Sequence, residues 1–225
     1  ASLEWLTHDI RQVVLEIVSG GPFAFSAGQY AQVAFAPALA KHYSMANRPD
    51  DPLLEFHVRR MPNGRCSAYV ADRLNVGDTV TVRGPHGVAY LREHHAGPIV
   101  LIAGGSGLAP MLSMLRRLLA IARTESIRLF FGVRTERDIY AEAALQAYAA
   151  AYPRFRFDIV LSESTAGRYP SGLVHAFAER HLRSVEQTMA YLAGPPVMIE
   201  AAVAMLKDKG LAQRSIHADA YYDQP

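Results

Sequence analysis

The hydrophobic pattern changes its period part-way along the chain, and this change constrains the fold more than any other feature. In residues 52–60, PLLEFHVRR, apolar and polar side chains alternate with the period of two that is typical of a half-buried strand. Residues 9–18, 28–35 and 77–85 repeat the pattern between Gly, Pro or Asp turn residues. A short helical stretch, residues 66–74, interrupts them. Several short strands at this spacing predict an antiparallel β-barrel.

The second half consists of continuous apolar runs that alternate with helical patterns. Residues 98–103, PIVLIA, are apolar throughout, as expected of a strand covered on both faces. The next apolar residues recur at helical spacing up to Leu119, which predicts a helix with Arg116 and Arg117 outside, in solvent. Further strands are expected at 127–133, 155–161, 189–194 and 215–221, and further helices at 142–151 and 197–210. This alternation predicts an α/β doubly wound parallel five-stranded sheet.

Length and composition narrow the possible functions. A chain of 225 residues is long enough for two domains, and we expect them to span residues 1–95 and 96–225 with the seam near residues 92–98. The formal charge of +2 and the scattered Lys and Arg residues give no reason to expect nucleic acid as a partner. No apolar run is long enough to cross a membrane. We expect the protein to lie in the reducing cytoplasm.

Cysteine and histidine usage excludes two kinds of site. Cys66 is the single cysteine, so the chain can form neither an internal disulfide nor a cysteine-ligated iron–sulfur cluster. His94 and His95 lack a second pair of ligands at useful spacing, so we expect no metal site there.

A glycine-rich segment follows the apolar strand. In residues 102–110, IAGGSGLAP, glycines let backbone N–H groups approach a ligand, and Pro110 opens a helix whose N-terminus favours an anion. A nucleoside triphosphate loop would need Gly-Lys-Ser/Thr at its end, and the lysine is absent. A dinucleotide-binding loop and a strand–helix turn without a ligand both remain compatible with this segment alone.

The order of several motifs resolves this ambiguity. They are KHYSMAN (41–47), EFHVRRMPNGRCSAYV (55–70), GPHG (84–87), AGGSGLAP (103–110), FGVR (131–134) and AGPPVM (193–198). In this order the chain resembles the ferredoxin–NADP reductase superfamily. More narrowly, it is similar to the FAD/NAD(P)H module of bacterial ring-hydroxylating dioxygenase reductases of the naphthalene dioxygenase type, lacking the [2Fe–2S] ferredoxin domain. The resemblance implies an FAD-binding β-barrel (1–95) followed by an NAD(P)H-binding α/β domain (96–225), with the active site between them.

The resemblance assigns the FAD-binding residues. Tyr43 is expected to pack against the flavin ring, and Ser44 to offer its hydroxyl to flavin N5. Lys41 replaces the arginine that is usual in the family, which retains a positive charge near the pyrophosphate but loses the bidentate geometry. The other residues implied are His57, Val58 and Arg59 along the flavin, and Gly64, Arg65, Cys66 and Ser67 at the helix N-terminus that faces the pyrophosphate. Cys66 is expected to be a small space-filling residue rather than a reactive thiol.

The resemblance also assigns the nicotinamide side. The residues implied are Gly104, Gly105, Ser106 and Gly107 in the glycine loop, Gly132, Val133 and Arg134 after the next strand, and Gly194, Pro195 and Met198 beside the nicotinamide. Ala193 stands where many relatives carry a cysteine, which puts the tuning of hydride transfer in question. Glu163 follows the third strand, where a carboxylate repels a 2′-phosphate and accepts hydrogen bonds from a free ribose diol, so we expect NADH rather than NADPH. Arg134, Arg137 or Arg168 could reverse this preference by binding that phosphate.

The resemblance also implies an activity. Ser44 and Tyr221 are the expected catalytic residues, with Tyr221 covering the flavin and Tyr222 as the alternative. NADH would pass a hydride to FAD, which would deliver single electrons to a [2Fe–2S] ferredoxin domain or protein that feeds a terminal, aromatic-ring-hydroxylating oxygenase. We expect that ferredoxin domain to precede Ala1, although a separate protein would also fit. The alternatives are a free-flavin or flavodoxin reductase, and a non-catalytic flavin-binding redox module.

Overall fold

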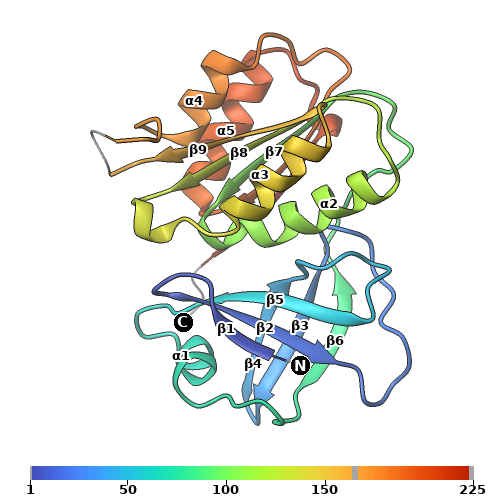
Figure 1. The fold of residues 1–225 in the computed structure, drawn as a ribbon, viewed down its shortest axis with the longest axis vertical. Helices are drawn as coiled ribbons and strands as arrows, with labels where there is room; N and C mark the ends of the chain where they lie inside the picture. Colours follow the sequence, from blue (N-terminus) through green and yellow to red (C-terminus); the bar gives the residue numbers. More distant parts are fainter. Residues whose placement is uncertain (1, 164–166, 223–225) are drawn as a thin grey trace.

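The computed structural model describes residues 2–163 and 167–222, and they form two domains that lie one above the other (Figure 1). In that view the N-terminal strands and one short helix make up the lower domain, here called the β domain. Its elements are β1 (Ser2–Trp5), β2 (Ile10–Glu16), β3 (Tyr30–Ala36), β4 (Leu39–Ser44), β5 (Leu53–Arg59), α1 (Arg65–Asp72) and β6 (Thr81–His86).

The strands of the β domain form two antiparallel sheets in the orders β1-β2-β5 and β4-β3-β6. A bridge between Met45 and Phe56 joins the end of β4 to β5, so the two sheets meet along that seam. Their inner faces enclose one apolar core, in which Val13, Val33 and Phe56 are completely buried. Because successive side chains of a strand point to opposite faces, the alternating pattern puts the polar residues outside. The antiparallel barrel class predicted from the sequence is confirmed.

The upper domain, here called the α/β domain, has a five-stranded parallel sheet in the order β11-β10-β7-β8-β9. The predicted doubly wound sheet is therefore confirmed. Its elements are β7 (Ile99–Gly104), η1 (Gly105–Gly107), α2 (Leu108–Ala120), β8 (Ile127–Val133), η2 (Glu136–Asp138), α3 (Glu142–Ala151), β9 (Phe155–Leu161), α4 (Val174–His181), β10 (Met189–Gly194), α5 (Pro196–Asp208), η3 (Gln213–Ser215) and β11 (Ile216–Ala220).

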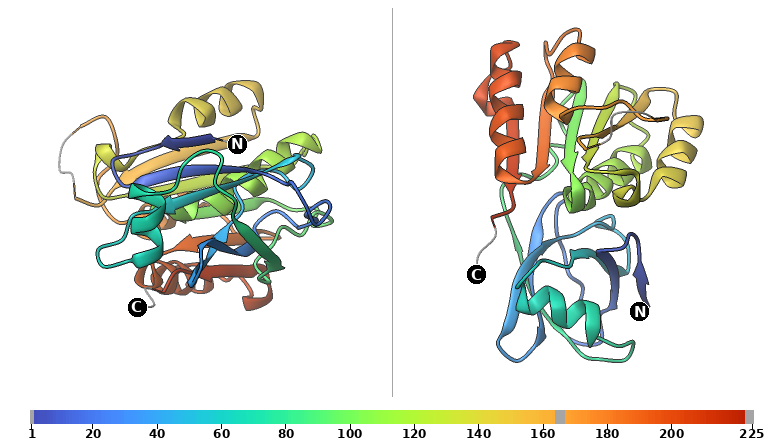
Figure 2. Two further views of the ribbon diagram at one scale, coloured as in Figure 1. Left: turned by 90° about the horizontal axis from the view of Figure 1, so that it is seen from below. Right: turned by 90° about the vertical axis from the view of Figure 1, so that its left-hand side faces the viewer.

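Helices cover both faces of the parallel sheet, as Figure 2 shows from the side. Leu101 and Phe131 point toward the layer of α2 and α3, whereas Ile102 and Phe130 point toward α4 and α5. Since both faces are covered, neighbouring residues of one strand are buried on opposite sides. This explains why the strands are apolar throughout rather than alternating.

Helix α2 lies between the sheet and the β domain, and its position corrects one expectation. Arg116 and Arg117 were expected in solvent, but both reach residues of the β domain or its connection to the sheet. Arg116 Nη1 lies 2.9 Å from the carbonyl oxygen of Ala46 and 2.7 Å from Glu55 Oε2. The prediction was wrong because the polar side of the helix faces a second domain, which the periodicity of one helix cannot reveal.

The connection between the domains runs from the end of β6 at His86 to the start of β7 at Ile99. The boundary expected between residues 95 and 96 falls inside this connection and stays a prediction. Among the described residues, no helix combines the length and apolar character needed to cross a membrane.

Candidate active site between the two domains

The two domains meet through a hydrogen bond between side chains that are far apart in the sequence. Ser44, the last residue of β4, is buried, and its Oγ lies 3.1 Å from the hydroxyl of Tyr221, just beyond β11. The backbone N–H of Tyr221 donates to the carbonyl of Gly194 at 2.9 Å, which fixes this segment to the end of β10. Tyr222 is largely exposed. The structure therefore brings together the two residues expected to be catalytic, and it favours Tyr221 over Tyr222.

Asp219 adds a titratable group to this pair, and the sequence analysis missed it. Burial raises the pKa of Asp219 to about 6, and a hydrogen bond from Ser44 opposes the shift. Burial also raises the pKa of Tyr221 well above its ordinary value, and the charge of Asp219 adds to the effect. A carboxyl group in contact with the serine that is expected to approach flavin N5 is thus partly protonated near neutral pH. Its position two residues before the end of the strand expected at 215–221 was the available signal.

Tyr43 lies on the opposite face of β4 from Ser44, because adjacent residues of a strand alternate. Its ring packs edge-on against Phe35 with centroids 5.7 Å apart, and its hydroxyl donates to Cys66 Sγ at 3.5 Å. Burial raises the pKa of the Cys66 thiol, while Tyr43 and the nearby charge of Lys41 only oppose it. Lys41, Tyr43 and Cys66 therefore gather between β4 and the start of α1.

The first turn of α1 was expected to face a pyrophosphate. The helix begins at Arg65, with Gly64 as its N-cap residue and no side-chain cap. The hydroxyl of Ser67 donates to the carbonyl of Gly64 at 3.1 Å and accepts from the N–H of Met61 at 3.0 Å. Ser67 thus stabilises the turn itself, which leaves backbone N–H groups as the donors that this helix end offers to an anion.

The side chains of the segment His57 to Arg59 already have contacts within the protein. Val58 belongs to the core of the β domain, and the side chain of His57 is buried against Glu55 and Tyr140. Arg59 Nε donates to Asp9 Oδ2 at 2.8 Å. A flavin along this segment would therefore contact backbone groups, as the resemblance implies.

The glycine loop is built by close backbone contacts. A Cβ atom at Gly107 would lie 2.1 Å from the carbonyl oxygen of Ala193, and one at Gly104 would lie 2.6 Å from the sulfur of Met198. Gly105 has a φ of +55° and faces nearly open space, since a Cβ there would meet only Arg59, at 3.5 Å. The loop therefore presents a surface without side chains toward the β domain, and a flat ring can approach its backbone closely there.

The ends of β8 and β9 form the next part of the site. A Cβ at Gly132 would lie 2.8 Å from Val174, so this glycine is required by the packing of α4. Arg134 is half exposed and lies 3.4 Å from Asp138. The N–H of Glu163 donates to the carbonyl of Arg134 at 2.9 Å, and Glu163 is exposed. The backbones of Arg134 and Glu163 are thus bonded to each other where the sheet ends.

The ends of β7 and β10 are joined through Met198. A Cβ at Gly194 would lie 2.9 Å from Met198 Cε, and Gly194 has a φ of +148°. Pro195 follows it and precedes α5, which starts at Pro196. Gly194, Pro195 and Met198 therefore lie directly beside the glycine loop, and their contact with the nicotinamide stays a prediction.

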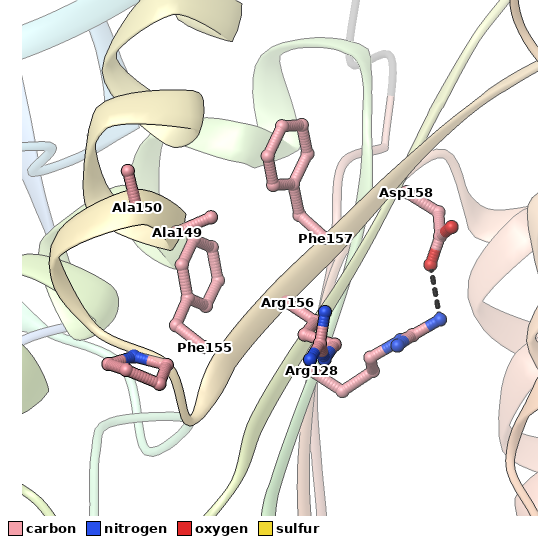
Figure 3. A pocket seen from close by; sticks show the side chains of 8 residues that line it. Arg128, Ala149, Ala150, Phe155, Arg156, Phe157 and Asp158 are labelled. Atoms are coloured by element: carbon pink, nitrogen blue, oxygen red, sulfur yellow. Dashed lines mark hydrogen bonds and ion pairs between the residues drawn. The ribbon is translucent and has the colours of Figure 1, made fainter.

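One group of described residues has the spacing of metal ligands, namely His8, Asp9 and Asp138. Arg59 pairs with Asp9, and Arg134 pairs with Asp138 at 3.4 Å. These arginines already balance the two carboxylates, so the cluster is an ion-pair network at the domain boundary. An open depression of about 550 Å³ lies elsewhere, beside α3 and the start of β9 (Figure 3). It is distant in the fold from Ser44 and from the glycine loop.

Comparison with known families agrees with this geometry. Residues 2–90 match the oxidoreductase FAD-binding domain, and residues 101–204 match the oxidoreductase NAD-binding domain. The chain is 42% identical over 222 residues to the ferredoxin–NAD(P)+ reductase component of the naphthalene 1,2-dioxygenase/salicylate 5-hydroxylase systems of Ralstonia, covering 98% of this chain and 67% of that protein. The chain belongs to the ferredoxin–NAD(P)+ reductase family. Its predicted class, an FAD-dependent oxidoreductase, is confirmed.

A further relative and two solved structures are similar to this chain over nearly its whole length. The naphthalene 1,2-dioxygenase reductase component of Pseudomonas putida is 40% identical, again over 98% of this chain and 67% of that protein. Among solved structures, the cytochrome P450 reductase GcoB of Amycolatopsis superposes with a TM-score of 0.91 at 35% identity, covering 97% of this chain and 67% of that one. The ferredoxin reductase in carbazole 1,9a-dioxygenase superposes with a TM-score of 0.88 at 29% identity, covering 98% and 67%. The chain thus corresponds to about two thirds of these proteins.

Proposed function

We propose that this chain is a flavin-dependent NADH reductase that takes a hydride from NADH onto FAD and passes single electrons to a [2Fe–2S] ferredoxin domain or protein, which feeds an aromatic-ring-hydroxylating oxygenase. The observation that carries the proposal is the contact between Ser44 and Tyr221, 3.1 Å apart, at the junction of an FAD-binding and an NAD-binding domain. A donor ring and an acceptor ring held at this junction would lie face to face.

The residues present fit FAD on the β-domain side. The N-terminus of α1 offers backbone donors to a pyrophosphate, and the positive charge of Lys41 lies close to that turn. Tyr43 offers an aromatic face, and Ser44 offers a hydroxyl to N5. FAD, when bound, supplies the chemistry that converts a two-electron donor into a source of single electrons.

The α/β domain supports binding of the nicotinamide nucleotide. The loop Gly104–Gly107 is glycine apart from Ser106 and provides backbone N–H groups, and Gly194 and Met198 adjoin it. Tyr221 occupies the position next to Ser44, and we propose that the nicotinamide ring replaces it there. Holding the ring against the flavin supplies proximity and orientation, which are the protein's main contribution to hydride transfer.

We propose NADH as the preferred donor because Glu163 stands beside the site expected for the ribose. Arg168, one of the cations that could bind a 2′-phosphate, is instead engaged with Glu142 at 2.9 Å. Arg134 is engaged with Asp138. A carboxylate disfavours a dianionic phosphate here, because Arg134 and Arg168 already pair with other carboxylates.

The acceptor follows from the relatives' printed roles and from this chain's single cysteine. Relatives are reductase components of naphthalene 1,2-dioxygenase, propane 2-monooxygenase and anthranilate 1,2-dioxygenase systems. Cys66 alone cannot hold an iron–sulfur centre, which needs four cysteines. We therefore propose a [2Fe–2S] ferredoxin domain or protein and a terminal oxygenase as partners, and the reducing, NADH-supplying cytoplasm as the location.

An anaerobic titration tests the proposal. The FAD-loaded chain should lose its visible flavin absorbance after one equivalent of NADH, and should then reduce a one-electron acceptor such as ferricyanide. Retention of the oxidised flavin spectrum in excess NADH would refute the reductase activity. A colourless purified chain that rapidly turns over added riboflavin would instead support a free-flavin reductase.

A further inference from the structure

A chain of buried polar groups connects β5 to the glycine loop. His57 Nε2 lies 2.8 Å from Glu55 Oε1, and His57 Nδ1 lies 3.3 Å from the hydroxyl of Tyr140. That hydroxyl lies 3.5 Å from the carbonyl oxygen of Gly105. The His57 side chain is 2% exposed and Tyr140 is 4% exposed, so water does not compete for these contacts.

The end of this series of polar groups that lies in the β domain is fixed by charge. Burial on its own would raise the pKa of Glu55, but the hydrogen bond from His57 and the charge of Arg116 outweigh burial and lower the pKa to about 2. Arg116 Nη1 lies 2.7 Å from Glu55 Oε2, and Gln12 donates to Oε1 at 2.8 Å. Glu55 is therefore a carboxylate and only accepts hydrogen bonds, which orients the Nε2–H of His57 toward it.

The other end of the series of polar groups is restrained by packing. The Tyr140 ring stands edge-on to His57, with centroids 5.3 Å apart, and edge-on to Phe131, with centroids 5.7 Å apart. Its hydroxyl can therefore move little. Gly105 has a φ of +55°, and a Cβ there would meet only Arg59, while its carbonyl also accepts the backbone N–H of Leu108 within the turn. The Tyr140 hydroxyl carries a single hydrogen. It donates that hydrogen to the Gly105 carbonyl when Nδ1 of His57 is itself a donor, as in an ion pair of His57 with Glu55, and it then restrains that carbonyl.

We propose that His57 and Tyr140 are positioning residues that hold the glycine loop at a fixed distance from the β domain. The inference rests on the proposed function, because the distance of the loop from the β domain sets the position of the nicotinamide ring relative to the flavin. Loss of the restraint should slow hydride transfer. Tyr140→Phe should leave FAD binding intact, since Tyr140 lies between η2 and α3 in the α/β domain and is not among the residues expected to bind FAD.

Transient kinetics of the FAD-loaded chain test the proposal. Tyr140→Phe removes one hydroxyl and keeps the ring, and we expect the limiting rate of anaerobic flavin reduction by NADH to fall roughly three- to tenfold, the effect of one hydrogen bond. His57→Gln should have a similar effect, and the double variant should be no slower than either single variant, because the two residues act as one unit. In Tyr140→Phe, reduction by dithionite and the flavin absorbance should not change. Tyr152→Phe, at an exposed tyrosine, is the matched control.

The outcomes separate the possibilities. Wild-type rates in Tyr140→Phe would overturn the proposal, as would equal slowing of reduction by NADH and by dithionite, which indicates general structural damage. Additive effects in the double variant would also contradict it. If His57→Gln does not fold, Tyr140→Phe still decides. Failure of the wild-type chain to be reduced by NADH would refute the proposed function instead, before any variant is compared.

Discussion

The two sides of the cleft are built in different ways. The nicotinamide side consists of backbone, because Gly104 and Gly107 pack so closely against β10 and α5 that no side chain fits. The flavin side also offers backbone groups, along β5 and at the start of α1, but its central contact joins two side chains, Ser44 and Tyr221, on different domains. A site made of backbone leaves a local pattern in the sequence, since the glycines themselves are the requirement. A site made of side chains depends on partners that the fold brings together.

The largest effect should come from disturbing the backbone side. Gly107→Ala would place a Cβ 2.1 Å from the carbonyl oxygen of Ala193 and 2.9 Å from the nitrogen of Gly194. Since neither backbone can move without disturbing β10, we expect a loss of about 3 kcal/mol in the free energy of unfolding, measured with urea.

Gly210→Ala is the control for this variant. Gly210 has a φ of +93° but nothing within 4 Å of a Cβ, so only backbone strain applies there. We expect that strain to cost about 1 kcal/mol. Equal losses in the two variants would show that close packing does not define the glycine loop.

The same distinction explains how much could be predicted from the sequence. The five strands of the parallel sheet and the glycine loop were found because periodicity and glycine spacing are local signals. The position of Arg116 was predicted wrongly, and Asp219 and Tyr140 were missed. Each of these depends on a contact across the domain interface, and such contacts leave no periodic signal in one sequence.

The next effect should be a pH dependence that originates at Asp219. Burial raises the pKa of Asp219 from 3.8 to about 6, so the native state binds this proton more tightly than the unfolded chain does. The stabilisation is complete below the unfolded value and is lost as the pH rises through the native value. Relative to Asp219→Asn, the wild-type chain should therefore lose roughly 3 kcal/mol of unfolding free energy over that interval.

Urea titrations of both proteins at a series of pH values measure this difference. It should become constant above the native pKa, where Asp219 is ionised in both states. A difference that is independent of pH throughout would mean that the carboxyl group is not buried against Ser44, and the flavin side would then lose one of its defining contacts.

A smaller effect is expected from Ser44→Ala. The variant removes the hydroxyl that bonds Tyr221 and is proposed to approach flavin N5, and it leaves a side chain that β4 accommodates. We expect the rate of flavin reduction by NADH to fall about tenfold, with little change in thermal stability. Ser19→Ala, in an exposed loop, serves as the control. An unchanged rate would remove Ser44 from the set of catalytic residues.

The smallest effect concerns the choice of donor and tests whether the backbone side also depends on one side chain. Glu163→Gln keeps the size of the side chain and removes its charge beside Arg134, to whose carbonyl its N–H is bonded at 2.9 Å. Because the carboxylate repels a 2′-phosphate across a solvent-exposed gap, where screening is strong, we expect the KM for NADPH to fall only about fivefold. The KM for NADH should stay the same or rise slightly. Steady-state kinetics with both nucleotides measure the ratio, and an unchanged ratio would assign donor selection to the backbone of the loop or to Arg134 rather than to Glu163.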